Sequence, residues 1–221
     1  MHNRLLKVIT DLFVFTMGFF SLIAPFVLPQ LTAGDVQSAV FPIMVSLIII
    51  ICLLIMILEA QSSLLDNKMI AFLAILTAIN AGLRFLENAI PGPGGFSPVF
   101  FIIILVGYFF GSRVGFLVGA MTMFVSGLIT GGIGPWLPGQ MITAGWVGQS
   151  APLIKVLVTK FQWNNKPGEI VLLAIFSAFW GLLFGAIMNL WFWPFLGAGA
   201  GQYYTKTVGL SKNFQRYLAY Y

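Results

Sequence analysis

The sequence is short of charge, histidine and cysteine, and each shortage excludes a class of protein. Only 8% of its 221 residues are charged, against roughly a quarter in a soluble domain, so the charged side chains cannot cover a water-exposed surface. The single histidine, His2, leaves no His-ligated metal cluster and no Ser-His dyad. The single cysteine, Cys52, excludes an intrachain disulfide. We expect no metal and no cofactor.

The residues that are present are mostly apolar. Hydrophobic residues make up 59% of the chain, and the mean hydropathy is +0.98. This composition predicts an integral protein of the cell membrane, folded as an all-α, polytopic transmembrane helix bundle. The formal net charge of +5 is better read as a record of membrane orientation than as affinity for nucleic acid.

Seven apolar segments can each supply a transmembrane helix, which needs about 20 residues to cross a bilayer. They cover residues 8–28, 39–58, 69–86, 97–110, 114–130, 141–158 and 170–195. A helical pattern at 212–221 predicts one more helix, and we expect that the sequence is cut short inside it. We divide the chain into a two-helix N-terminal extension, residues 1–68, and a membrane core, residues 69–221.

The lysines and arginines predict that the N-terminus is cytoplasmic. With that orientation seven of them lie inside (Arg4, Lys7, Lys68, Arg113, Lys155, Lys160 and Lys166), and four lie outside (Arg84, Lys206, Lys212 and Arg216). The connections at 88–96, 131–140 and 197–210 are then all external. They are rich in glycine, proline and aromatic residues, which is typical of loops that bind a small molecule.

The segment 69–86 has two different faces at 100° per residue. Small residues line one side: Ala71, Ala74, Ala78 and Gly82. Asn80, Arg84 and Glu87 lie on the opposite side. Small residues at this spacing let another helix approach closely, whereas polar groups at membrane depth face a protein interior or a cavity. The alternatives are ordinary packing within the chain for the stripe, and an ion pair that merely ends the helix for Arg84 and Glu87.

Further polar and aromatic residues gather near the predicted outer side. They are Asn88, Trp136, Gln140, Trp146, Gln149 and Asn189, and we predict that they complete a substrate site with Asn80, Arg84 and Glu87. Gln149 lies within an apolar stretch and needs a hydrogen-bond partner. The alternative for the tryptophans is an aromatic belt at the membrane interface. Two other small ridges, Gly115 with Gly119 and Ser177 with Gly181, Gly185 and Asn189, are predicted to pack helices together.

Motifs for independent energy conversion or catalysis are missing from the sequence. It has no G-x-x-x-x-G-K-[ST] motif for nucleotide hydrolysis. All six carboxylates lie at or near predicted span ends, whereas ion-coupled carriers often place one at the midplane. We therefore predict that the protein is not an enzyme.

The stretch from Arg84 to Leu153, which includes RFLENAIPGPGGF and GGIGPWLPGQ, resembles the substrate-binding S component of energy-coupling factor (ECF) vitamin transporters. The resemblance runs from Met69 to the C-terminus. Ala74 and Ala78 match the family's Ala-x-x-x-Ala motif. The resemblance implies a six-helix core that binds a vitamin on the outer side and docks on a transmembrane T subunit, with ATPase subunits as further partners. The extra N-terminal helices and the largely missing last core helix depart from this pattern.

Three functions are open at this point. The first is a substrate-binding membrane subunit that captures a vitamin or related micronutrient for ATP-driven import. The second is a stand-alone secondary carrier or facilitator for a small metabolite, and the third is a membrane enzyme or assembly factor. Dependence on a partner ATPase separates the first from the second, and turnover in detergent identifies the third. The loop pattern resembles that of cobalamin-type S components, with riboflavin and smaller vitamins as alternatives.

Overall fold

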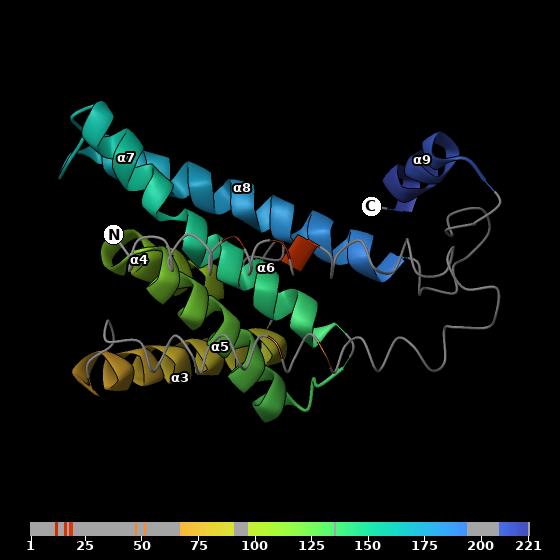
Figure 1. Ribbon diagram of the computed structural model, residues 1–221, viewed down its shortest axis with the longest axis horizontal. Coiled ribbons are helices and arrows are strands. Elements are labelled where there is room, and N and C mark those ends of the chain that lie inside the picture. Colours follow the sequence, from red (N-terminus) through yellow and green to blue (C-terminus); the bar gives the residue numbers. More distant parts are fainter. Residues whose placement is uncertain are drawn as a thin grey trace.

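The computed structural model describes residues 67–90, 97–134, 136–193 and 208–220, together with residues 12, 16, 18, 19, 47 and 51. These residues form helices and turns, and no strand occurs among them. The helices run side by side along the long axis of the molecule, with α9 near the far end of α8 (Figure 1). The predicted all-helical, polytopic class is confirmed by these helices, four of which are long and apolar enough to cross a membrane.

The helix bounds correct the predicted spans in three places. The helices are α3 (Asn67–Ala89), α4 (Val99–Phe110), α5 (Ser112–Thr130), α6 (Leu137–Ser150), α7 (Pro152–Lys160), α8 (Pro167–Phe192) and α9 (Leu210–Tyr220). Helices α6 and α7 form one 24-residue span, Leu137–Lys160. Counted so, the described part has six helices, whereas two of the seven predicted spans lie before residue 67. The two N-terminal spans of that count, and with them the proposed extension at 1–68, lie almost wholly outside the described residues.

The other two corrections concern helix ends next to prolines. Helix α6 begins at Leu137 and not at Met141, with Pro138 in its first turn, where the fixed φ of proline favours a helix start. Four residues of the predicted loop 131–140 are therefore helical. Helix α8 ends at Phe192 and not at residue 195. Trp193 still has helical φ and ψ, and Pro194 lacks the N–H that would continue the helical hydrogen bonds.

Helices α4, α5 and α6 cross one another where glycines lie at their contact points. A Cβ on Gly107 would lie 2.0 Å from the Gly148 carbonyl oxygen, and one on Gly115 would lie 2.4 Å from the same atom. Gly119 is equally close to α6, because its Cβ would come within 2.2 Å of the Ala144 oxygen. Backbones can approach this closely only where side chains are absent. The predicted packing role of Gly115 and Gly119 is confirmed.

The α8 ridge behaves differently. A Cβ on Gly181 would meet no atom within 4 Å, and Gly181 is exposed. The prediction that this ridge packs against another helix is therefore wrong at Gly181 for the part of the chain that is described. Nearby side chains on α8, such as Leu182, are also exposed, which suits a surface that faces lipid.

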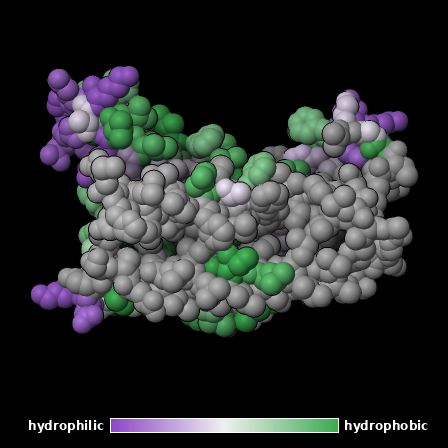
Figure 2. Space-filling view, viewed as in Figure 1, coloured by the Kyte–Doolittle hydropathy of each residue, from purple (hydrophilic) through white to green (hydrophobic). Residues whose placement is uncertain are grey.

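Hydrophilic and hydrophobic side chains occupy different parts of the surface along the long axis of the molecule. Hydrophilic side chains gather at the outer corners, where α3 begins, where α7 meets α8, and at α9, while hydrophobic side chains lie between them (Figure 2). This is the distribution that a bilayer imposes, with charged groups at the two water interfaces and apolar groups at depth. It supports the multi-pass membrane location.

Candidate functional site

Helix α3 turns its polar side into the bundle. Asn80 is fully buried, and Arg84 and Glu87 are partly buried. On the opposite side Ala71, Ala74 and Ala78 are exposed, and a Cβ on Gly82 would meet no atom within 4 Å. The described structure therefore uses the polar side of α3 for internal contacts and leaves the small stripe uncovered.

Asn80 joins three helices. Its Nδ2 donates to the Val99 carbonyl oxygen at the start of α4 and to Thr122 Oγ1 on α5, each at 3.1 Å. Its Oδ1 is buried and accepts no hydrogen bond from the residues that the structure describes. A buried polar atom left in this way costs roughly 1–3 kcal/mol. Asn80 is thus a structural link that still carries one unsatisfied acceptor.

Arg84 and Glu87 lie further along α3, and each has a partner on another segment. Arg84 donates from Nη2 to Gln140 Oε1 on α6, at 3.3 Å. The Ser97 hydroxyl donates to Glu87 Oε2 at 2.8 Å. Both side chains therefore bridge α3 to its neighbours, which goes beyond the simple ion pair that would only end a helix.

Two of these partners, Ser97 and Thr122, were missed from the sequence. Thr122 lies on α5 with Ser126 four residues later, and both are fully buried. Polar residues at that spacing in an apolar helix were the available signal. Nothing in the sequence identified Ser97, because its contact with Glu87 depends on how the chain returns from α3 to α4.

The remaining predicted site residues are placed at different levels. Gln140 lies in the first turn of α6, whereas Gln149 lies nine positions later, about 13 Å further along the helix. Trp146 is buried between them. Gly18, one of the few N-terminal residues described, lies against this tryptophan, so that a Cβ on Gly18 would come within 2.4 Å of the indole ring.

Helix α8 approaches the first turn of α6. A Cβ on Gly139 would lie 3.7 Å from the end of Met188 and 3.9 Å from the Trp191 indole. Asn189 is partly buried on this part of α8, so it lies near the level of Gln140. Trp136 is 37% exposed, and its Nε1 donates to the Gly132 oxygen at 3.1 Å. The side chain of Asn88 lies outside the described part.

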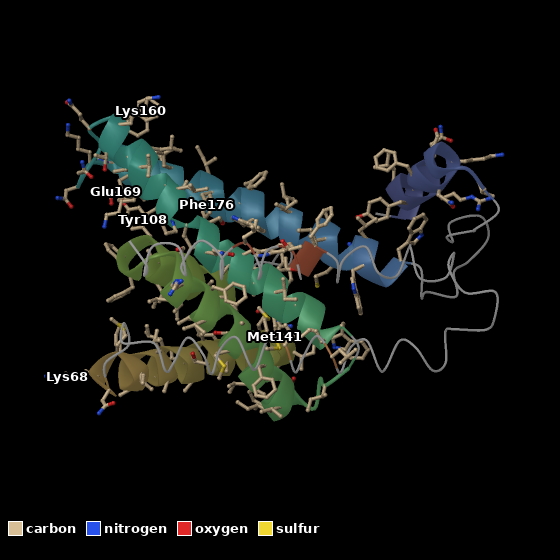
Figure 3. All side chains as sticks on the ribbon, in the orientation of Figure 1. Lys68, Tyr108, Met141, Lys160, Glu169 and Phe176 are labelled. Carbon is tan, nitrogen blue, oxygen red and sulfur yellow. The ribbon has the colours of Figure 1, made fainter. Side chains whose placement is uncertain are left out.

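The candidate site therefore has a compact centre. Asn80, Arg84 and Gln140 lie where α3, α5 and α6 meet near the start of α6, with Glu87 on the next turn of α3. Met141, labelled in Figure 3, marks this level of the bundle. Trp146 and Gln149 lie deeper along α6. Among the described residues no group of three or more His, Cys, Asp and Glu side chains could hold a metal ion.

A second polar cluster lies at the other end of the bundle. Tyr108 on α4 donates its hydroxyl to Glu169 Oε1 on α8, at 2.6 Å. The Asn165 backbone N–H donates to the second carboxylate oxygen at 2.7 Å. Figure 3 shows Tyr108 and Glu169 close together, far from Met141. Both oxygens of Glu169 have partners within the chain, which marks this cluster as structural.

Comparisons with known proteins bear on the whole helical core. No curated protein and no solved structure matched the chain. The family model of the ECF transporter substrate-specific component matches residues 68–218, which is more than half of the chain. Members of this family are transporter subunits rather than enzymes, and they work with T and ATPase subunits. This chain belongs to the family of ECF transporter substrate-specific components.

Proposed function

We propose that this subunit captures a vitamin or related micronutrient on the outer face of the cell membrane, for ATP-driven import by its T and ATPase subunits. The observation that carries the proposal is the two-sided α3 helix. One side holds Asn80 and Arg84 inside the bundle, and the other presents uncovered small residues. A protein that must both hold a substrate and dock on a partner needs two such surfaces.

The substrate site is proposed at the centre formed by Asn80, Arg84 and Gln140. Arg84 has several N–H donors, and within the described ranges one of them donates to Gln140, at 3.3 Å. The Asn80 Oδ1 atom adds a buried acceptor. A ligand with amide, carbonyl or ring-nitrogen groups offers both the acceptors and the donors that these atoms need. Glu87, Asn88 and Asn189 are proposed to line the same site.

Trp136 is proposed as part of the cover over this site. It lies in the α5–α6 connection, next to the glycines that make this turn permissive. Its hydrogen bond to the Gly132 oxygen fixes the ring to the connection itself. A cover held in this way can move as one unit when a ligand enters. Trp146 and Gln149, deeper on α6, are proposed to meet only a ligand that extends inward.

The stripe of Ala71, Ala74, Ala78 and Gly82 is proposed as the surface that docks on the T subunit. Three of these residues are exposed, and the fourth has open space around it. In a membrane, association between helices depends on close packing rather than on hydrophobic burial. With the N-terminus cytoplasmic, α3 runs outward, so its polar end lies on the side from which substrate arrives.

Uptake by cells tests the proposal against its rival. Cells that carry this chain together with its T and ATPase subunits should accumulate one labelled compound from a panel of vitamins, including cobalamin and riboflavin. Cells with the same chain and an ATPase lacking its catalytic carboxylate should bind the compound at the surface but not accumulate it. Equal accumulation by this chain alone would support the stand-alone carrier and overturn the proposal.

A further inference from the structure

The turn between α7 and α8, residues 161–166, carries an unusual combination of cationic and aromatic side chains. Lys160 and Lys166 flank it, and Lys155 lies two turns earlier on α7; all three are exposed. Phe161 is 52% exposed and Trp163 is 37% exposed. Figure 2 shows hydrophilic and hydrophobic side chains directly beside one another at this corner of the molecule.

The turn is well defined by its own contacts. The backbone N–H of Trp163 donates to the Val158 carbonyl oxygen, and the backbone N–H of Lys166 donates to the Trp163 carbonyl oxygen, both at 2.9 Å. The Trp163 ring lies over Gly168, where a Cβ would come within 2.5 Å of it. Phe161 and Trp163 have ring centroids 5.2 Å apart. The two aromatic rings are therefore held in place before any ligand arrives.

The charge of the turn is not balanced locally. Glu169 is the one carboxylate in the sequence between residues 88 and 221, and its oxygens accept from Tyr108 and the Asn165 N–H. The carboxylate is thus turned toward α4 and the backbone. Lys155 lies close enough to offset part of this carboxylate's charge, and its Nζ is 5.9 Å from the centroid of the Tyr108 ring. Lys160 and Lys166 therefore remain for an external anion.

The depth of the turn identifies that anion. The span Leu137–Lys160 has 24 residues, or about 36 Å of helix, against about 30 Å of hydrocarbon core. The end of α7 and the turn therefore lie at the level of the lipid headgroups. Lysines extend toward phosphate at this level, and tryptophan is enriched there because its ring is apolar and its N–H is polar.

We infer that the α7–α8 turn is a binding site for the headgroups of anionic phospholipids, with Lys160 and Lys166 contacting phosphate, Lys155 adding positive charge nearby, and Trp163 inserted at the interface. The site anchors this end of the bundle to one leaflet. The excess of lysine and arginine at the same end assigns the cytoplasmic leaflet, where anionic lipids gather. The inference stands apart from the substrate proposal, because none of these residues lies near Arg84.

Local lipid composition at Trp163 tests the inference. The full chain is placed in vesicles of equal phosphatidylglycerol and phosphatidylcholine, with one or the other brominated, and Trp163 emission is isolated by subtracting the Trp163→Phe variant. Brominated phosphatidylglycerol should quench it more strongly. Each lysine changed to glutamine should lower the relative affinity for phosphatidylglycerol by about fivefold, and the triple variant should lose the preference. High salt should also weaken the preference of the unaltered chain for phosphatidylglycerol.

A charge-matched control separates this site from net charge. Changing Lys68, Lys212 and Arg216 to glutamine removes the same charge elsewhere and should leave the preference at Trp163 intact. Equal quenching by both lipids in the unaltered chain, or an equal loss in the control variant, overturns the inference. So does a triple lysine variant that keeps its lipid preference but no longer associates with the T and ATPase subunits, since the occupant is then an acidic protein surface.

Discussion

Two rows of small residues lie on neighbouring helices and have opposite surroundings. Gly115 and Gly119 on α5 are buried against α6, with carbonyl oxygens within 2.4 Å of any added Cβ. Ala74 and Ala78 on α3 are exposed. Spacing predicts in both cases that a helix can approach closely, but it does not say which helix. The α5 row completes the fold of the chain itself, and the α3 row is the surface that we propose for the T subunit.

The largest expected effect comes from filling the buried row. Gly148→Leu places a side chain against the Gly115 backbone, where a Cβ already meets the carbonyl oxygen at 2.1 Å. Because backbone atoms on both helices would have to separate, the change should cost more than about 3 kcal/mol. Thermal unfolding and size-exclusion chromatography in detergent should show loss of the folded protein.

Gly181→Leu is the matched control, since a Cβ there meets no atom within 4 Å. It should leave the melting temperature nearly unchanged. If both variants melt alike, the glycine contacts between α5 and α6 do not hold the bundle together.

The next largest effect concerns the inner side of α3, which is held by polar contacts instead of glycines. Arg84→Gln removes the charge and shortens the reach toward Gln140. If Arg84 contacts substrate, a lost hydrogen bond of roughly 1–3 kcal/mol should weaken binding about 5- to 150-fold. Isothermal titration with the imported compound measures this change, and Arg84→Lys should retain part of the affinity. Unchanged affinity in Arg84→Gln, with the protein folded, would move the site elsewhere.

The sequence predicted those features of the site that depend on one helix, but not those that depend on contacts between helices. The inward direction of Asn80 and Arg84 follows from the 3.6-residue period together with the cost of exposing polar groups to lipid. Their partners do not, because Thr122 and Gln140 come from other helices whose crossing angles no local pattern records. The same limit applied to α6: its early start at Leu137 moved Gln140 out of a predicted loop and into a helix. Depth along α6 also separated Gln140 from Gln149.

A smaller effect is expected at the opposite end of the bundle. Tyr108→Phe removes the hydrogen bond to Glu169 but keeps the ring, so stability should fall by about 1 kcal/mol. Substrate affinity should stay the same, because the cluster lies far from Met141 (Figure 3), the neighbour of the Gln140 that bonds Arg84. Chemical denaturation and titration on one preparation compare the two properties. A fall in affinity as large as that of Arg84→Gln would mean that the two ends are coupled.

The central claim is that the two sides of α3 have separate tasks, and the most direct test measures binding and transport on the same variant. Ala74→Trp fills the exposed stripe without touching Asn80 or Arg84. We expect affinity for the substrate within about twofold of the unaltered chain, since the change lies outside the site. ATP-driven uptake by the full complex should be abolished, because a bulky ring prevents close helix contact. Equal loss of binding and uptake would contradict the account.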